Sequence, residues 1–318
     1  MNNFWKKLPK PIYALAPMAG VTDSAFRQMC KRFGANVVYS EMISATAIAY
    51  DSKKTLELMK FDKKERPFVV QLFGSKPEHF AFATKYITKK IKPDGIDINF
   101  GCPVKKVAKQ GAGAALMDNP KLARQIVEAV IANTNLPVSI KVRSQVGKTT
   151  ALDFLNYLSD LDIKAVMIHG RTLNQGHSGT VNYEIIKQAH KFFKGIILAN
   201  GGVKNWGDSQ RMLALTGADG IGIGQGALGR PYIFKQLFEP LINAESADYT
   251  KKKFIFKILL KHAKLVDKLK GEQGIIEMRK HLCWYVNGLK DASALRNRLV
   301  KVKSLNEIEK ILRNKNIG

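Results

Sequence analysis

Eight short apolar runs, each followed by a stretch with helical character, constrain the fold of this 318-residue chain more than any other feature. Most of the runs are rich in β-branched or large apolar residues and end in Gly, Pro or a polar residue. Continuous apolar runs, without strict alternation, indicate strands buried on both faces, as in parallel sheets. The predicted strands are Ile12–Ala16, Val37–Met42, Phe68–Phe73, Gly95–Asn99, Pro137–Val142, Ala165–His169, Gly195–Asn200 and Asp219–Gly224.

Helical signals fall between the predicted strands. Apolar residues recur at i, i+3, i+4 and i+7 from Phe26, after Asp23. The Ser-Lys-Pro-Glu segment at 75–78 predicts a capping box, and Asn119 before Pro120 predicts another helix start. About eight β-α units predict an α/β fold of the TIM (β/α)8 barrel type. A large doubly wound open sheet is the alternative.

The pattern changes near residue 241, beyond which no clear strand follows. Met278, Leu282 and Tyr285 are helix-spaced, and a final helix is predicted near Leu305–Ile311. We therefore predict two domains, a catalytic TIM barrel over residues 1–240 and a small all-α domain over residues 241–318.

The charge of the chain points to a polyanionic partner. It holds 52 Lys and Arg against 26 Asp and Glu, a net charge of +26. Since 40 of the basic residues are Lys, a Lys-rich composition accounts for part of the excess. Residues 241–318, with 18 basic and 8 acidic residues, carry about twice the net charge per residue of the remainder. The net charge fits nucleic acid or a membrane surface as the partner, and nucleic acid is favoured over a merely solvated basic face.

Other features exclude several classes of protein. Three cysteines cannot form a disulfide framework, and neither they nor the six histidines have the spacing of a metal site, so no metal is expected. No apolar run approaches the ~20 residues of a membrane span. Pro9 and Pro11 follow Lys6 and Lys7 without an apolar segment, so no signal peptide is predicted and a cytoplasmic location is expected.

Function in a TIM barrel is located at the carboxyl ends of the strands. Nearly every predicted strand here ends in polar residues or glycine, which predicts an enzyme face. Glycines after the seventh and eighth strands suit a phosphate, although tight turns would also use them. The residues at these ends are Pro17, Met18, Ala19, Gly20, Glu41, Gln71, Asn99, Cys102, Lys141, Arg143, His169, Arg171, Asn200, Gly201, Gly202, Gly222, Gly224 and Gly226.

The cysteines differ in their surroundings. Cys30 lies on an apolar helical stripe and Cys283 flanks another, so both are interpreted as structural. Cys102 lies between Gly101 and Pro103 in a loop over the predicted barrel mouth. With an ordinary pKa of about 8.5 this thiol would be a proton donor at pH 7, whereas a depressed pKa would make it a nucleophile. The sequence leaves both roles open.

Two further polar side chains also have several possible roles. Lys141 at a strand end could form a Schiff base, hold an anion or face a reduced flavin ring. His169 could be an acid, a base, a ligand or a satisfied hydrogen-bonding residue.

Several motifs occur in a recognisable order. Together they resemble the tRNA-dihydrouridine synthase family, most closely its bacterial B-type subgroup, over roughly residues 11–302. The motifs are Pro17-Met18-Ala19-Gly20-Val21-Thr22-Asp23, Gln71-Leu72-Phe73-Gly74, Asn99-Phe100-Gly101-Cys102-Pro103, Lys141-Val142-Arg143, His169-Gly170-Arg171-Thr172 and Gly229-Arg230-Pro231.

The resemblance implies an FMN-containing TIM barrel with a helical tRNA-binding domain. Such an enzyme reduces the C5=C6 bond of particular uridines in tRNA and uses NADPH, or NADH, as the reductant of the flavin. Cys102 would be the general acid, and Asn99, Arg143 and Arg171 would contact the substrate. No membrane and no obligate protein partner are expected. The residues implied to bind the cofactor are Pro17, Met18, Ala19, Gln71, Lys141, His169, Asn200, Gly201, Gly202, Gly224 and Gln225.

The chain departs from the subgroup at two positions. Asn-Gly-Asp is usual after the seventh strand, where this chain has Asn200-Gly201-Gly202, and Gly-Arg is usual after the eighth, where it has Gly224-Gln225. FMN binding is expected to persist through backbone donors. Two other hypotheses remain, a flavin enzyme acting on a free pyrimidine and a non-catalytic RNA-binding protein on a barrel that has lost its activity.

Overall fold

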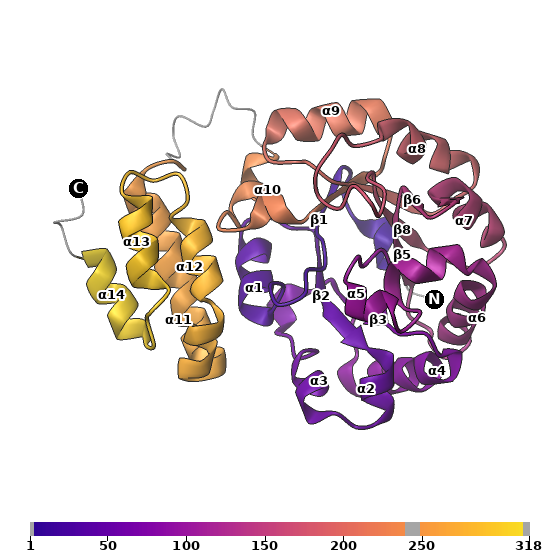
Figure 1. Cartoon of the computed structure of the whole chain (residues 1–318), viewed down its shortest axis with the longest axis horizontal. Helices are drawn as coiled ribbons and strands as arrows, with labels where there is room; N and C mark the ends of the chain where they lie inside the picture. Colours follow the sequence, from indigo (N-terminus) through magenta and orange to yellow (C-terminus); the bar gives the residue numbers. More distant parts are fainter. Residues whose placement is uncertain (1–2, 239–248, 314–318) are drawn as a thin grey trace.

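The computed structural model contains a closed barrel of eight parallel strands (Figure 1). The barrel closes because β1 pairs with both β2 and β10, which excludes the open sheet and confirms the predicted TIM barrel. Around the barrel the order is β1-β10-β9-β8-β5-β4-β3-β2. The barrel strands are β1 (Ile12–Leu15), β2 (Val37–Ser44), β3 (Phe68–Phe73), β4 (Gly95–Phe100), β5 (Val138–Arg143), β8 (Ala165–His169), β9 (Ile196–Asn200) and β10 (Gly220–Ile223).

The structure describes residues 3–238 and 249–313, so the predicted domain boundary at residues 240 and 241 lies outside the described residues. A short antiparallel hairpin that the sequence did not suggest, β6 (Gln145–Val146) and β7 (Thr149–Thr150), follows β5.

Helices surround the barrel (Figure 1). Two of their predicted starts are confirmed, since the Asp23 side chain accepts from the Phe26 N–H and Asn119 accepts from Leu122. The predicted capping box at 75–78 is wrong, because Lys76 occupies the cap position and makes no side-chain capping bond. These helices are α1 (Ser24–Arg32), α2 (Ala45–Ala49), α3 (Lys53–Glu57), α4 (Pro77–Tyr86), α5 (Lys105–Ala108), α6 (Pro120–Ile131), α7 (Ala151–Tyr157), α8 (Tyr183–Gln188), α9 (Trp206–Thr216) and α10 (Ile233–Gln236).

Shorter helical turns lie between these elements. In the ranges 3–238 and 249–313, five are 3-10 turns, and η3 is a π-helical turn that continues α4. They are η1 (Phe4–Lys7), η2 (Lys63–Glu65), η3 (Ile87–Ile91), η4 (Gly113–Asp118), η5 (Ala189–Lys191) and η6 (Gln225–Ala227).

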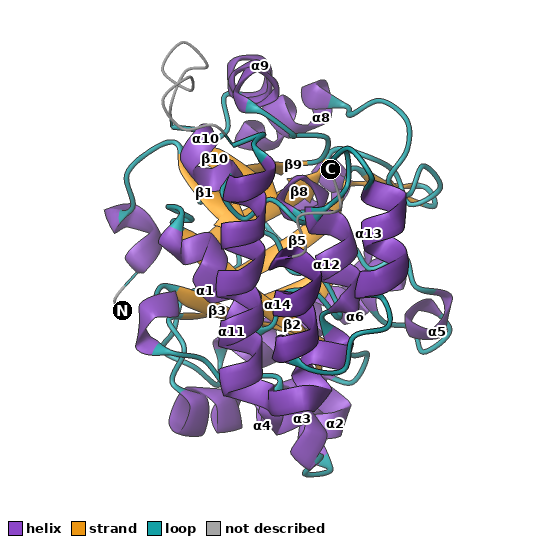
Figure 2. Cartoon of the chain, turned by 90° about the vertical axis from the view of Figure 1, so that its left-hand side faces the viewer, coloured by secondary structure: helices purple, strands orange, loops and turns teal. Residues whose placement is uncertain are grey.

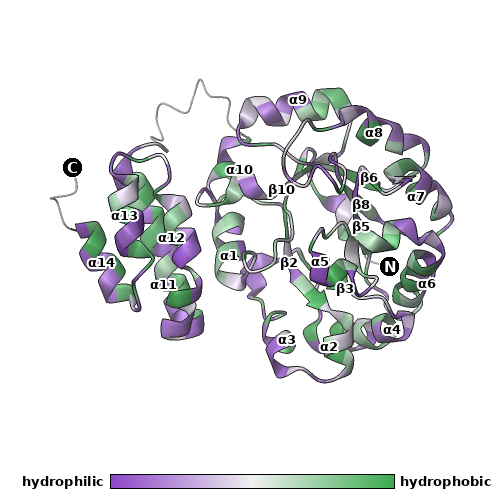
Figure 3. Ribbon diagram, viewed as in Figure 1, coloured by the Kyte–Doolittle hydropathy of each residue, from purple (hydrophilic) through white to green (hydrophobic). Residues whose placement is uncertain are grey.

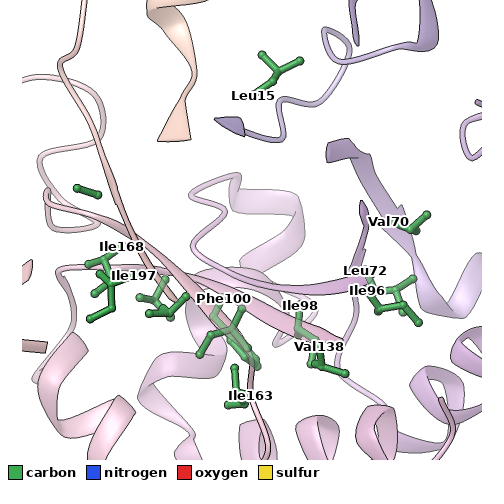
Figure 4. Packing of buried hydrophobic residues seen from close by; sticks show 14 of the residues in the cluster. Leu15, Val70, Leu72, Ile96, Ile98, Phe100, Val138, Ile163, Ile168 and Ile197 are labelled. Atoms are coloured by element: carbon green, nitrogen blue, oxygen red, sulfur yellow. The ribbon is translucent and has the colours of Figure 1, made fainter. Parts of the chain in front are cut away.

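Alternate residues of each strand face opposite sides of the sheet, which separates two cores. Val70, Leu72, Ile96 and Ile98 belong to the large cluster between the strands and the helices (Figure 4). A smaller cluster with Val69, Met167 and Leu198, which alternate with those outward residues, forms the apolar layer inside the barrel. Polar residues at the inward-facing positions near the carboxyl ends of the strands therefore point into the barrel mouth.

The strand register brings the inward polar residues into rows. Gln71 pairs with Asp97, and Asp97 pairs with Ser139. One row further along, Asn99 pairs with Lys141. The last row contains Arg143, His169, Asn200 and Gly222. The parallel register thus gathers residues that lie far apart in the sequence at one end of the barrel.

Residues 249–313 of the tail form four helices beside the α1 and α10 side of the barrel (Figures 1 and 2). They are α11 (Lys252–Glu277), α12 (Arg279–Tyr285), α13 (Ala292–Leu299) and α14 (Leu305–Arg313), and the residues described after 248 include no strand. The ribbon of this unit carries both hydrophobic and hydrophilic stretches (Figure 3). Within the ranges 3–238 and 249–313, no helix is long and apolar enough to cross a membrane.

The helical unit packs directly on the barrel. Ala25 and Met29 of α1 join its hydrophobic cluster, and the Lys270 ammonium lies 2.9 Å from the Asp23 carboxylate. The backbone at Gly229 approaches α12 so closely that a Cβ there would lie 2.3 Å from the carbonyl carbon of Trp284. A residue larger than glycine at 229 would therefore push the two units apart.

Candidate active site

A cavity of about 480 Å³ opens at the carboxyl ends of the barrel strands. Its size lies in the range of about 300–1,000 Å³ that is usual for cofactor and ligand sites. Four cationic side chains line it (Lys141, Arg143, Arg171 and Lys204) and its described lining contains no carboxylate. The cavity is therefore built for an anionic ligand.

All of the residues implied to bind the cofactor, contact the substrate or donate the proton line this cavity, whereas Gly20 and Glu41 at the predicted strand ends do not. The implied residues are Pro17, Met18, Ala19, Gln71, Asn99, Cys102, Lys141, Arg143, His169, Arg171, Asn200, Gly201, Gly202, Gly224 and Gln225. The structure adds lining residues that the sequence did not indicate, among them His177, Lys204 and Trp284. Trp284 belongs to α12, so the helical unit contributes to the wall of the cavity.

A buried carboxylate, Asp97, organises one side of the cavity. It accepts hydrogen bonds from Gln71 Nε2 at 2.7 Å and from Ser139 Oγ at 2.6 Å. Gln71 Oε1 in turn accepts from Asn99 Nδ2 at 2.8 Å. Because a carboxylate only accepts, it fixes which end of the Gln71 amide faces it, and Gln71 then fixes the Asn99 amide. Burial raises the pKa of Asp97 to about 6.

The fixed Asn99 amide shapes the loop that carries Cys102. Asn99 Oδ1 accepts from the backbone N–H groups of Gly101 at 3.1 Å and Cys102 at 2.9 Å. A chain of hydrogen bonds thus links the buried Asp97 to the backbone of the thiol-bearing loop. Asp97 and Asn99 are two residues apart on β4, so their side chains lie on the same face of the sheet. This spacing is the signal in the sequence that places them together.

The Cys102 thiol is nearly buried, with 8% of the residue exposed. Burial raises its pKa above the usual range, and a hydrogen bond from the Val104 backbone and the charges of Arg143 and Lys141 only partly oppose this. The thiol is therefore protonated at neutral pH. Of the two roles that the sequence left open, this environment favours the proton donor over the thiolate nucleophile.

Lys141 and His169 share the floor of the cavity. Burial, reinforced by the nearby Arg143 charge, lowers the pKa of Lys141 to about 8, and the Asp97 carboxylate acts in the opposite direction. Burial and the surrounding cations lower the pKa of His169 to about 2, so its imidazole is neutral. A neutral imidazole has one donor and one acceptor nitrogen for a ligand.

Arg143 is largely engaged by the protein. Its Nε donates to the Gly101 carbonyl at 2.9 Å, and Nη1 donates to the carbonyls of Thr172 and Gly176 at 2.9 and 3.0 Å. These bonds tie the Cys102 loop to the loop after β8. The predicted contact of Arg143 with the substrate stays a prediction, and its visible role is to position both loops.

The opposite side of the cavity consists largely of backbone. Asn200 Nδ2 donates to the Gly222 carbonyl at 2.7 Å and joins the ends of β9 and β10. Gly201 has φ +121° and Gly202 φ +77°, conformations that side chains rarely permit. A Cβ on Gly201 would lie 2.9 Å from the His169 ring, and one on Gly226 would lie 2.2 Å from the Val203 carbonyl. Glycine keeps this edge open for a ligand.

Comparisons with known proteins agree with this geometry. The dihydrouridine synthase (Dus) family model matches residues 14–317. "Probable tRNA-dihydrouridine synthase" of Aquifex aeolicus is 33% identical, over 93% of this chain and 93% of that protein. tRNA-dihydrouridine synthase B of Xanthomonas axonopodis pv. citri is 36% identical, over 86% of this chain and 83% of its own length.

Among solved structures, an old yellow enzyme homologue from Zymomonas mobilis has the same kind of barrel. It aligns with a TM-score of 0.54 at 14% identity, over 76% of this chain and 90% of that one. This likeness concerns the fold. The barrel and its polar mouth are typical of a TIM-barrel enzyme. The family match, over most of the chain, shows that it belongs to the dihydrouridine synthase family of enzymes.

Proposed function

We propose that this protein is a flavin-dependent tRNA-dihydrouridine synthase that reduces the C5=C6 bond of specific uridines in tRNA. The observation that carries the proposal is the protonated Cys102 thiol at the edge of a cationic, glycine-lined cavity. The relatives named as tRNA-dihydrouridine synthases support the same substrate.

The cavity fits FMN in size and in chemistry. The open glycine edge at Gly201, Gly202 and Gly224 offers backbone N–H groups to a phosphate, and the four lining cations would balance its charge. Pro17, Met18 and Ala19 give the cavity an apolar wall for a ring system. Bound FMN would supply the hydride that adds to C6 of the uracil ring.

Reduction of the double bond also requires a proton at C5 of the uracil. Cys102 is the lining residue suited to give it, because its raised pKa keeps the thiol protonated at neutral pH. The bond chain from Asp97 through Gln71 and Asn99 holds the Cys102 loop in place without a change of protonation.

Lys141 and His169 would serve the cofactor rather than the uracil. The half-buried Lys141 ammonium, which lines the cavity, would stabilise negative charge on the ring system. The neutral His169 would add a hydrogen bond without a second full charge.

The helical unit would help a uridine of the tRNA to reach the cavity. A uridine inside folded RNA must be turned out of its stack to enter the cavity, at a cost of a few kcal/mol. Contacts between the basic tail and the RNA phosphates would offset part of that cost. Trp284 lies where the barrel mouth meets the helical unit and offers an aromatic surface to the extruded nucleotide. Such a substrate implies a cytoplasmic reaction.

The test is an assay on a tRNA transcript that lacks dihydrouridine. Purified protein with FMN and NADPH should form dihydrouridine at defined positions, and mapping those positions would identify the uridines it selects. NADH in a parallel reaction would establish which nicotinamide is the better reductant.

Two results would contradict the proposal. Equal turnover of free uridine and of tRNA would favour a flavin enzyme for free pyrimidines. A protein that binds tRNA with a steep salt dependence but takes up no FMN would be a non-catalytic RNA-binding protein.

A further inference from the structure

Arg171 lies against the glycine edge of the cavity. Its Nε donates to the Gly179 carbonyl at 2.8 Å, which fixes the orientation of the guanidinium. Nη1 lies 3.3 Å from the position that a Cβ on Gly201 would take, and Nη2 lies 3.6 Å from that of a Cβ on Gly202. The outer edge of the guanidinium therefore faces the backbone of these two glycines.

This guanidinium has no counter-ion among residues 3–238 and 249–313. No described carboxylate forms an ion pair with Arg171, and none lines the cavity. The nearby charged groups on β5, Lys141 and Arg143, are also cationic. An arginine is always charged, so this half-buried guanidinium can accept an anion from outside the chain as its partner.

We infer that Arg171 binds the phosphate of the flavin, with Nη1 and Nη2 directed at a phosphomonoester seated on the backbone of residues 201–202 and 224–226. This inference rests on the proposed function, because it presupposes a flavin in the cavity. It assigns to the cofactor a residue that the sequence resemblance had given to the substrate. Two parallel N–H donors match the geometry of phosphate oxygens.

The same geometry connects the two departures from the subgroup. An aspartate at position 202 would begin 3.6 Å from Arg171 Nη2 and would pair with it. With Gly202 the guanidinium stays free, and at position 225 an exposed glutamine stands where an arginine is usual. One carboxylate and one guanidinium are lost together, so the charge offered to the phosphate is conserved.

The inference is tested by comparing FMN with riboflavin, which lacks the phosphate. Flavin-free protein is titrated with each, and binding is measured through the flavin fluorescence. Arg171→Gln should weaken FMN binding by about 10- to 100-fold and riboflavin binding by less than about threefold. Arg171→Lys, which keeps the charge but loses the fork, should recover part of the FMN affinity.

Lys204 provides the matched comparison, since it lines the same cavity and carries the same charge without a guanidinium fork. Lys204→Gln should weaken FMN binding less than Arg171→Gln does. The double variant Arg171→Gln/Gln225→Arg should recover FMN affinity, because it returns a guanidinium to the same edge.

Two variants at Gly202 separate the effect of charge on FMN binding from the effect of backbone strain. Gly202→Asp should weaken FMN binding more than Gly202→Asn does, since both side chains meet the same positive φ but only aspartate neutralises Arg171. This pair keeps the inference testable if Arg171→Gln does not fold.

The outcomes are distinct. Equal loss of FMN and riboflavin affinity in Arg171→Gln would assign Arg171 to loop structure through Gly179, and no loss of either would also overturn the inference. A larger effect of Lys204→Gln than of Arg171→Gln would move the phosphate contact to Lys204. If the unmodified protein binds neither flavin, the proposed function itself fails.

Discussion

The polar atoms on the two sides of the cavity differ in their hydrogen-bond partners. On the side of β3, β4 and β5, hydrogen bonds within the protein connect Asp97, Gln71, Asn99 and the Cys102 loop. On the side of β8, β9 and β10, the lining is mostly glycine backbone, and the Arg171 guanidinium faces it without a carboxylate among the described residues.

The difference matches the chemistry that each side would perform. A proton donor must have a defined position and pKa before the substrate arrives. The residues that hold it therefore form their hydrogen bonds within the protein, without the substrate. A phosphate site must leave donors unused until the ligand supplies the acceptors. The first side should therefore govern turnover and the second should govern flavin affinity.

The largest expected effect is on the proton-donating side. Cys102→Ala should lower turnover on tRNA about 1,000-fold, because the uracil loses its proton donor. The flavin absorbance and the rate of flavin reduction by NADPH should stay within about twofold of the unmodified protein. Near-normal turnover in this variant would remove Cys102 from the proposed reaction.

The pH profile should report the same thiol. Cys102 acts only when protonated, so the turnover rate on tRNA should fall as the pH rises through its raised pKa, in addition to any loss near pH 8 from deprotonation of Lys141. Neutral His169, with a pKa of about 2, should add no further transition near neutral pH. A rate that rises as the thiol ionises would contradict a proton-donating thiol.

On the phosphate side, Gly201→Ala should weaken FMN binding about 10- to 100-fold. The new Cβ would meet the His169 ring at 2.9 Å, at a φ of +121° that alanine rarely adopts. The fraction of protein that still carries flavin should turn over at nearly the normal rate. Gly288→Ala is the control, since its φ is also positive but nothing lies within 4 Å of the new Cβ.

A smaller effect is expected from Asp97→Asn, which keeps the shape but removes one acceptor. One of its two partners, Gln71 or Ser139, would face an N–H group, so turnover should fall about tenfold and unfolding should need about 1–3 kcal/mol less free energy. Flavin affinity should change less than in Gly201→Ala. Chemical denaturation and tRNA assays measure the two effects.

This variant also has a defined pH dependence. The pKa of Asp97 is about 6 in the folded protein, against about 3.9 for an exposed aspartate. Between these values the folded protein binds the proton more tightly, so lowering the pH from 6 to 4 stabilises it relative to the unfolded chain. Asp97→Asn cannot bind that proton. The stability difference should therefore shift further in favour of the unmodified protein as the pH falls.

The smallest effect concerns neither side of the cavity. Neutralising Lys253, Arg296 and Arg298 of the helical unit to Gln should raise the KM for tRNA several-fold, because phosphate contacts are lost. It should also flatten the dependence of binding on salt, and flavin reduction should not change.

The matched control neutralises Lys187, Lys191 and Lys194, three exposed lysines in and after α8. If these barrel substitutions raise the KM as much as those in the tail, net charge alone guides the RNA.

Strands and most of the cavity were predictable because each depends on local pattern. β3 and β8 have the bounds that the apolar runs indicated, and the polar strand ends could be read directly from the sequence. The β6–β7 hairpin was missed because each strand has two residues and no apolar pattern.

Residues whose partners come from distant strands could not be predicted. Asp97 lies within an apolar run, and its meaning depends on the register that brings Gln71 and Ser139 beside it. The place of Trp284 in the cavity wall depends on how the helical unit packs on the barrel, and no sequence motif indicates that packing. The approach of Arg171 to Gly201 and Gly202 could not be predicted either, because Arg171 follows β8 and the two glycines follow β9.

The close approach of Gly229 to Trp284 has a consequence for how such proteins can be recombined. Exchanging the helical unit between relatives would transfer part of the cavity wall together with the surface proposed to dock RNA. A chimera joined between the two units would therefore change which nucleotides the pocket accepts, even with every barrel residue retained. On the proposed function, substrate choice and docking would therefore be inherited together.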